Sequence, residues 1–425
     1  MKLPPGLAPL RERDFALYWY GQTTSQIGTW AELTTTSWLL YDLTSSPLLL
    51  GLNGIFRAAP VLLLSLLGGA VADRVPRKRL ILITLTAEAL VAFALGALVV
   101  TGAVRFWHLY IATAVTGTLV SFEQPARLAM YPSLVSRAQL QNAVMLHAVI
   151  HRSSTLIGPA IGGLLIARFG IAVPYFVNAA SFVAILLALL AIHVPDHAVR
   201  IRASVAREVL DGLRYVGRHR VLPALFLAEI AVSLFGHNSA LVTIYARDVL
   251  HVDAQGLGIM LGAVGAGALV GVAVLLATGD VRRKGALMLG GGLAYAATLL
   301  AFGNAPAFVV AVVALLLVGL ADSMWGSMRN TIMQTAIADA YRGRVMSLNI
   351  IVPRGLTNLS HLQTGIAVSL FGPPGAVLLG GAVIAAVVAG TAARSRELRG
   401  YETATLAVDA DAEPSVASSR YTTLS

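Results

Sequence analysis

Among the carboxylates that lie inside apolar runs long enough to cross a bilayer are Glu32, Glu229 and Asp322. A charged side chain at the centre of a spanning helix costs about 2.5 to 3.5 kcal/mol, so each must face protein or water. A carboxylate that loses its hydration in a cavity is neutralised readily by a proton. These three residues are therefore candidates for proton coupling.

Uncharged polar residues repeat at helical spacing around two of these carboxylates. In the seventh apolar run, Ser233 and His237 follow Glu229 at intervals of four. The first run carries a longer stripe around Glu32, which contains Gln22, Ser25, Thr29 and Thr36. Such stripes either join helices by hydrogen bonds or bind a polar solute. We expect them to contribute to a solute cavity.

Basic residues also occur within the apolar runs. Arg57, Arg152 and Arg354 would balance the carboxylates or attract an anionic group of a solute. Arg354 shares its helical face with Asn358 and His361, which we add to the candidate cavity residues. Glu88 in the third run is interpreted as structural or locally paired. Since no carboxylate cluster accompanies the histidines, we expect neither a metal nor a cofactor.

The composition restricts the class of protein. The 425-residue chain is 57% hydrophobic and 12% charged, which is typical of a polytopic membrane protein. It contains no cysteine, so disulfides and thiolate ligands are excluded. The net charge of +10 indicates membrane topology and no nucleic-acid partner.

Hydropathy predicts an all-α protein with twelve transmembrane helices. The expected domains are an N-terminal six-helix bundle (1–192), a cytoplasmic linker with an amphipathic helix (193–220), a C-terminal six-helix bundle (221–399) and a disordered cytoplasmic tail (400–425). The expected spans are Phe15–Tyr41, Leu48–Ala72, Leu80–Val100, Phe106–Gln124, Leu140–Ala167, Val173–Ile192, Val221–Tyr245, Leu257–Ala277, Gly285–Phe302, Ala307–Trp325, Val345–Leu370 and Gly375–Ala393.

The distribution of basic residues predicts the orientation. Of the 31 Lys and Arg residues, 25 fall in the termini and the alternate loops, while only Arg105, Arg168 and Arg247 fall in the opposite loops. Because basic loops stay on the cytoplasmic side, both termini are expected in the cytoplasm.

The two halves of the chain repeat weakly. Leu50-Gly51-Leu52 parallels Leu257-Gly258-Ile259, and Ser25 to Gly28 parallels Ser233 to Gly236. Matches in the same order at a nearly constant offset favour two bundles related by a parallel repeat.

One charged loop carries a family resemblance. Gly69, Asp73, Arg74, Arg77 and Lys78 follow the second apolar run in a spacing that resembles the loop motif of the major facilitator superfamily, with Pro76 where glycine is usual. The resemblance implies a cytoplasmic latch between Asp73 and Arg127, modulated by Glu123, and a cavity lined by the first, fourth, seventh and tenth spans.

Further segments resemble the enterobactin-exporter-like branch, also called transmembrane secretion effectors. They include Gly28-Thr29-Trp30, Pro125-Ala126-Arg127, Ile157-Gly158-Pro159-Ala160 and Arg342-Gly343-Arg344-Val345-Met346-Ser347. The resemblance implies a bacterial inner-membrane exporter of drugs, siderophores or other amphipathic metabolites, often with proton antiport, whose partners are a small-molecule substrate, protons and the bilayer.

Several alternatives remain beside an exporter of this kind. An uncoupled facilitator or importer of the same fold is the nearest one. A membrane enzyme should carry grouped His, Asp or Glu residues in an interfacial loop, and the sequence has no such group. We expect a transporter that functions as a monomer, because two bundles suffice to form a pathway.

Overall fold

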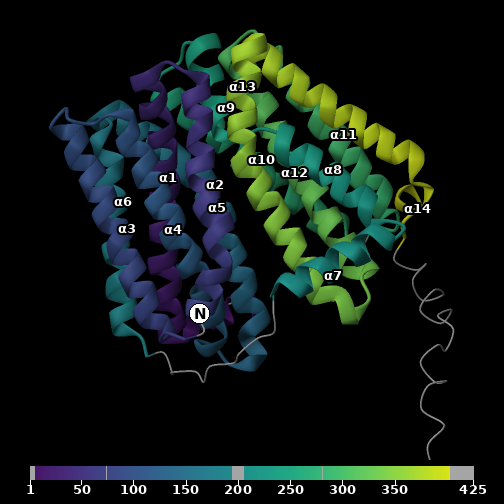
Figure 1. The fold of residues 1–425 in the computed structure, drawn as a ribbon, viewed down its shortest axis with the longest axis horizontal. Helices are drawn as coiled ribbons and strands as arrows, with labels where there is room; N and C mark the ends of the chain where they lie inside the picture. The colour runs from purple at the N-terminus through teal and green to yellow at the C-terminus, as the bar shows by residue number, and fades with distance from the viewer. Residues whose placement is uncertain (1–4, 73, 194–204, 280, 403–425) are drawn as a thin grey trace, which may run out of the picture.

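The computed structural model describes residues 5–72, 74–193, 205–279 and 281–402. Two helical bundles lie side by side and meet at one end, at the top of Figure 1. All the named elements of the described residues are helices, in agreement with the expected all-helical architecture. The domain boundaries drawn from the sequence stay a prediction.

The N-terminal bundle consists of six long helices in chain order. After the short 3-10 helix η1 (Pro5–Arg11), they are α1 (Arg13–Thr44), α2 (Pro47–Ala72), α3 (Arg77–Val100), α4 (Phe106–Met130), α5 (Leu140–Phe169) and α6 (Ala172–Ala191). Two short 3-10 helices, η2 (Tyr131–Ser133) and η3 (Arg137–Gln139), join α4 to α5.

The C-terminal bundle follows the linker helix α7 (Val205–Arg218). Its elements are α8 (Leu222–Phe235), α9 (Ser239–Ile244), the π-helical turn η4 (Tyr245–Val249), α10 (Ala254–Thr278), α11 (Lys284–Gly303), α12 (Phe308–Ala336), α13 (Asp339–Arg394) and α14 (Arg396–Arg399). Helix α13 makes two crossings, because Gly372 interrupts it with a left-handed φ of 71°. Only glycine adopts this conformation without strain.

By length and hydropathy, nine helical segments of the described residues could each cross a membrane. One of these segments, Gly355–Arg394, contains the break at Gly372 and so spans twice. Helices α1 and α4 are more polar and complete the twelve crossings.

Three helix ends differ from the sequence expectation. Helix α4 passes through Pro125 and ends at Met130, whereas we expected a loop from Pro125. Proline is tolerated within spanning helices, since neighbouring groups satisfy the freed carbonyl. Helix α12 extends to Ala336, so Arg329 lies within a helix and not in a loop. The seventh span is broken between α8 and α9, where the Asn238 side chain caps α9 by accepting from the Leu241 amide at 2.9 Å.

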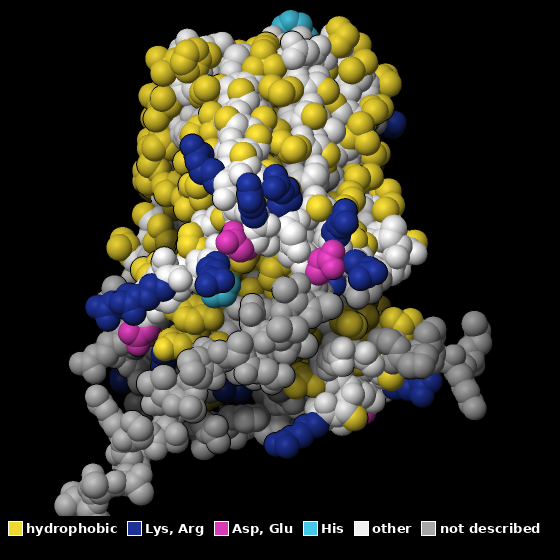
Figure 2. Space-filling model, turned by 90° about the vertical axis from the view of Figure 1, so that its right-hand side faces the viewer, with side chains coloured by type: hydrophobic (Ala, Val, Ile, Leu, Met, Phe, Trp, Pro, Cys, Tyr) yellow, Lys and Arg dark blue, Asp and Glu magenta, His cyan; other side chains and the backbone are white. Residues whose placement is uncertain are grey.

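Large apolar side chains cover the outside of the bundles. On α12, Val309, Val313 and Leu317 follow one another every four residues and are 70%, 52% and 42% exposed. Figure 2 shows such an apolar surface over the upper part of one face of the molecule, with Lys and Arg side chains gathered below it. This pattern is that of a lipid-facing wall with a basic rim.

Glycines let the two bundles approach closely along two helix pairs. A Cβ added at Gly51 of α2 would lie 3.1 Å from the Gly365 Cα of α13. A Cβ added at Gly258 of α10 would lie 3.1 Å from the Gly163 Cα of α5. Gly51 and Gly258 are the two glycines that the sequence repeat aligns. The repeat therefore corresponds to equivalent contacts between the halves, which permit close backbone packing.

Candidate functional site

A small polar cavity lies inside the N-terminal bundle. Its volume is about 70 Å³. Five helices line it with Thr29, Glu32 and Leu33 of α1, Arg57 and Val61 of α2, Glu88 of α3, Thr116, Gly117 and Val120 of α4, and Asn178 and Phe182 of α6. Among the described residues, those that line the cavity all belong to the N-terminal half. The structure thus brings together three predicted site residues, Thr29, Glu32 and Arg57.

Helix α6 holds the polar stripe of α1. The Asn178 amide donates a hydrogen bond to Glu32 Oε2, and Thr36 Oγ1 lies 3.1 Å from the Tyr175 hydroxyl. Gln22 and Ser25, which lie nearer the N-terminus of the helix, are buried at 1% and 2% exposure. The stripe therefore packs within its own bundle, where polar side chains join helices.

Glu88 is the residue whose environment the sequence did not indicate. Its side chain is 7% exposed, and Oε1 has no hydrogen-bond partner among the described residues. The local pairing expected for this residue is therefore absent at Oε1. Leaving a buried acceptor unsatisfied costs about 1 to 3 kcal/mol, and more for a charged group. The polarity pattern along α3 gives no sign of this, since only the fold places Glu88 and Arg57 in the lining of one cavity.

Arg57 is the basic side chain of this cavity. The charges of Glu32 and Glu88 both act on its guanidinium. A second pair lies within α4, where Arg127 forms an ion pair with Glu123 one turn away. The family resemblance singled out Glu123 and Arg127 for the latch, and the structure pairs them with each other.

The C-terminal bundle contains a different charge network. Glu229 of α8 forms an ion pair with Arg329 of α12, and both side chains are 10% exposed. Trp325 Nε1 donates to Glu229 Oε2 at 3.1 Å, and Ser233 Oγ donates to Oε1 at 3.0 Å. Both oxygens of this carboxylate are thus satisfied. The hydrogen bond of Ser233 to Glu229 follows the predicted spacing. The sequence analysis did not predict that Trp325 and Arg329 also contact Glu229, because both lie on another helix, α12.

His237 lies at the break in the seventh span. Its backbone amide donates to the Tyr295 hydroxyl at 2.8 Å, and its Nδ1 lies 2.9 Å from the same oxygen. Asp322 acts electrostatically on both His237 and Tyr295. The structure therefore places two predicted residues, His237 and Asp322, around a tyrosine of α11 that the sequence did not single out.

The predicted stripe on α13 lies at the contact with α2. A Cβ added at Gly54 would lie 2.7 Å from the His361 Cβ and would also clash with the Asn358 carbonyl. The charge of Arg57 acts on His361 across this contact. The side chains of Arg152 and Arg354 lie outside the described part of the structure, so their predicted roles stay predictions.

Polar contacts join the halves at the far end of α1. Arg247 Nη2 lies 2.6 Å from Asp42 Oδ1, and the Tyr41 hydroxyl donates to Asp248. The Arg247 guanidinium also lies over the Trp38 ring, 5.4 Å from its centroid. The sequence did not indicate this cluster, because its members come from different halves: Asp42 and Arg247 are 205 residues apart in the chain.

The predicted latch is only partly within the described structure. Asp73 lies outside the described residues, and Arg127 pairs with Glu123 as given above. Arg74 is exposed, while Lys78 Nζ donates to the Ile192 carbonyl at 2.8 Å and so fastens the end of α6. Gly69 has open space around it, whereas a side chain at Gly68 would clash with the Ser121 carbonyl. Arg77 is the first residue of α3. Its role in the latch, and the latch itself, stay predictions.

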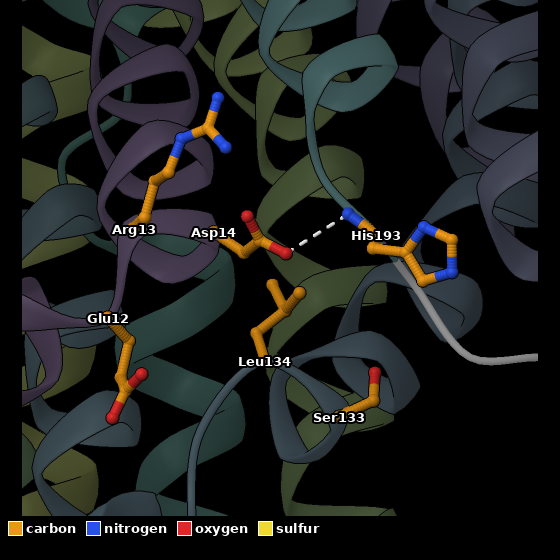
Figure 3. Close-up of a pocket in the computed structure, with 6 residues that line it drawn as sticks. All are labelled: Glu12, Arg13, Asp14, Ser133, Leu134 and His193. Carbon is orange, nitrogen blue, oxygen red and sulfur yellow. Dashed lines mark hydrogen bonds between the residues drawn. The ribbon is translucent and has the colours of Figure 1, made fainter.

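A second pocket, of about 240 Å³, opens where α1 begins. Figure 3 shows Asp14 directed toward His193, whose backbone amide donates to Asp14 Oδ2 at 3.0 Å. Glu12, Arg13 and Ser133 complete the polar lining. Since the pocket lies at the end of the bundle and the hydrogen bond joins α1 to the end of α6, we assign it a structural role.

Known proteins resemble this chain in sequence over most of its length. A transporter-like protein of Bacillus subtilis, YfiS, is 29% identical over 234 residues, which are 52% of this chain and 54% of that protein. The staphyloferrin A transporter of Staphylococcus aureus is 25% identical over 81% of this chain and 87% of its own length. The enterobactin exporter EntS of Shigella boydii is 28% identical over 72% and 73%. The chain thus spans about half of the first relative and most of the other two.

Solved structures share the fold. The nucleoside transporter NupG superposes with a TM-score of 0.70 at 14% identity, covering 92% of this chain and 100% of NupG. A D-xylose-proton symporter gives 0.69 at 15%, covering 93% and 99%. These confirm the major facilitator fold. The sequence also matches the transmembrane secretion effector family over residues 5–419. The chain therefore belongs to the transmembrane secretion effectors of the major facilitator superfamily, a family of multi-pass membrane transporters.

Proposed function

We propose that this transporter exports a small amphipathic organic solute across the bacterial inner membrane, by alternating access coupled to inward proton movement. The observation that carries the proposal is the one-ended contact between the halves. Asp42 and Arg247 join the halves where α1 ends, and the paired glycines of α2 with α13 and of α5 with α10 lie along the same joint. Two rigid bundles joined in this way can rock about a site between them.

The relatives support the class of solute and the direction. One is named an enterobactin exporter and another a staphyloferrin A transporter, so both handle siderophores. A siderophore or a similarly amphipathic metabolite is the solute that we propose for this chain. Drugs remain a broader possibility from the family resemblance alone.

The orientation follows from the basic residues. Arg127 and Arg329 were counted with the loops, but both lie in buried ion pairs and are removed from the count. The bias of Lys and Arg toward the side of the termini persists without them, which supports cytoplasmic termini. We further propose that helices α1, α4, α8 and α12 line a solute cavity between the halves, that Asp73 and Arg127 form the latch, and that one chain suffices for transport.

Proton coupling is proposed from buried carboxylates. Glu32, Glu229 and Asp322 lie within spanning helices, where ionised side chains are costly and mark functional sites by default. An uncoupled facilitator or importer would need no titrating group and is the second candidate. The observation that favours it is the full pairing of Glu229.

The test uses purified full-length protein in liposomes loaded with a pH-sensitive dye. Enterobactin, staphyloferrin A, a lipophilic cation and a macrolide are added in turn. We expect a solute-evoked pH change for one siderophore and none for protein-free liposomes. The exposed variant Glu397→Gln should behave as the unsubstituted protein. Counterflow of a solute that persists without a pH gradient, with no pH change, would favour the uncoupled facilitator instead.

A further inference from the structure

The cavity of the N-terminal bundle is too small for an organic solute. Its volume of about 70 Å³ compares with about 300 to 1,000 Å³ for pockets that enclose small molecules. A water molecule occupies about 30 Å³ in the liquid. The cavity therefore has room for a few waters, and its ligand must be of that size. Its polar lining, with Thr29, Thr116 and Asn178, would hydrate such a ligand.

The charges in this bundle do not balance. Glu123 is matched by Arg127 one turn along α4. Glu32 and Glu88 then share the single guanidinium of Arg57. Among the described residues that line the cavity, this leaves one carboxylate charge in excess, and one bound proton removes it. A buried ion without a partner is costly, which favours uptake of that proton.

Glu88 is the carboxylate best placed to take up the proton. Glu32 already accepts a hydrogen bond from Asn178, whereas Glu88 Oε1 is buried without a partner among the described residues. The ionisable groups that act on Glu88 are Glu32 from α1, Arg57 from α2, and Glu123 and Arg127 from α4. From α6, which also packs against α3, the cavity lining is Asn178 and Phe182, and neither titrates.

We propose that Glu88 is the proton-binding residue of this transporter, sharing the charge of Arg57 with Glu32 in a cavity of the N-terminal half that is large enough for water. The inference rests on the proposed antiport, but it assigns the proton to Glu88 in place of Glu32, Glu229 or Asp322. Proton binding converts the Glu88 carboxylate to the neutral acid and leaves Arg57 paired with Glu32. Glu229 is not assigned this role, because both of its oxygens are already bonded, by Arg329, Trp325 and Ser233.

Arg57 also connects this cavity to the joint between the halves. It lies one turn after Gly54, which packs directly against His361 of α13, and its charge acts on that histidine. When the halves move, the surroundings of Arg57 change with them. Arg57 can then attract Glu88 more strongly in one conformation than in the other, which is what coupling requires.

The experiment measures protonation directly, without any solute. Infrared difference spectra of the full-length protein in liposomes are recorded as the pH is lowered, and the carboxylic C=O stretch of buried acids is followed. We expect Glu88→Gln to lose this band and Glu397→Gln, on the exposed face of α14, to keep it. Glu229→Gln should also keep it. A band that survives in Glu88→Gln would overturn the proposal.

A second variant tests the sharing of Arg57, and a separate measurement detects misfolding. In Arg57→Gln the band should persist to higher pH than in the unsubstituted protein, since the remaining carboxylates have lost their cation. An unchanged pH range would contradict the proposed sharing. Each variant is first checked for monodisperse elution, so that loss of the band reports a lost acid and not a lost fold.

The same liposomes separate this inference from the proposed function. Enterobactin accumulation driven by an imposed pH gradient should fall to equilibrium in Glu88→Gln, while counterflow continues. If the band is lost in Glu88→Gln but unsubstituted protein never accumulates solute with a pH gradient, the antiport is wrong and the proton site stands. Accumulation that follows a sodium gradient at constant pH would show that sodium and not the proton is the coupled ion, and this would overturn the proposal.

Discussion

The two halves share one fold but differ in how they satisfy their buried carboxylates. In the C-terminal half, Glu229 meets a guanidinium, an indole N–H and a hydroxyl. In the N-terminal half, Glu88 has a buried oxygen without a partner among the described residues and competes with Glu32 for Arg57. A fully paired carboxylate stabilises a bundle in one charge state, whereas an underpaired one can exchange a proton. The repeat thus preserves helix packing, whereas the pairing of the buried carboxylates differs between the halves.

The largest expected effect is a difference in stability between two variants, each of which neutralises one buried carboxylate in one half. Glu229→Gln leaves the buried Arg329 without its counter-ion, which should cost about 3 to 5 kcal/mol of stability. Glu88→Gln removes an excess charge and should change stability by less than about 1 kcal/mol. Denaturant unfolding in micelles, followed by tryptophan fluorescence, measures both.

The matched control is the double variant Glu229→Leu with Arg329→Met. Because an apolar pair of similar size can replace a buried ion pair at little cost, it should recover most of the stability. Equal destabilisation by Glu229→Gln and Glu88→Gln would remove the contrast between the halves.

The glycine contacts test where the halves are alike. Gly51→Val and Gly258→Val each insert a side chain into a contact with a facing glycine, at Gly365 and Gly163. Overpacking of about 1 to 3 kcal/mol should shift the population away from this joined conformation by about 5- to 150-fold. The effects should be similar, since the contacts are equivalent in the repeat.

Spin labels can follow that shift without background, because the chain has no native cysteine. Cysteines replacing Ala103 and Ala307, which are exposed in loops at the joined end, would report the distance between the halves. Gly290→Ala, at a glycine with open space around it, is the control. A distance distribution left unchanged by either valine would contradict the assigned joint.

A smaller shift is expected from the polar contacts at the same end. Asp42→Asn removes the ion pair with Arg247, whose side chain is 32% exposed. Such partly exposed pairs contribute about 0.2 to 1 kcal/mol, so the open population should rise up to about fivefold. The same spin-label pair measures it. The exchange of charges in Asp42→Arg with Arg247→Asp should restore the original distribution if the pair itself matters.

The smallest effect should come from an exposed ion pair outside both networks. Arg283 lies 3.6 Å from Glu402, and its side chain is 79% exposed. Arg283→Gln should therefore change unfolding free energy by less than about 0.5 kcal/mol. A loss as large as that of Glu229→Gln would show that the contrast reflects charge removal in general and not burial.

The sequence was sufficient for most features that depend on local spacing. Hydropathy predicted the spans, the repeat aligned Gly51 with Gly258, and the interval of four paired Glu229 with Ser233. Partners on other helices could not be predicted, because they depend on how the bundles pack. Arg329 and Trp325 for Glu229, Asn178 for Glu32 and the contact of Arg247 with Asp42 are all of this kind.

A local rule failed at Pro125, and the loop motif left one close packing contact unidentified. Pro125 was expected to end a helix, but α4 continues to Met130, since the membrane favours helical backbone wherever neighbours can satisfy it. The charged loop drew attention to Gly69, whereas the glycine in close contact is Gly68 against Ser121. A motif identifies a segment, and only the fold identifies which of its glycines has no room for a side chain.

The two glycine contacts also define a line across the molecule, from α2 and α13 on one side to α5 and α10 on the other. Rotation of one half about this line leaves the contacts in place while points distant from it travel furthest. For a rotation of about 15° and an arm of about 30 Å, the displacement is about 8 Å. That is comparable to the width of a fused aromatic ring system. Side chains as small as a hydrogen atom would thus set the position of a hinge and, with it, the size of molecule that the opening admits.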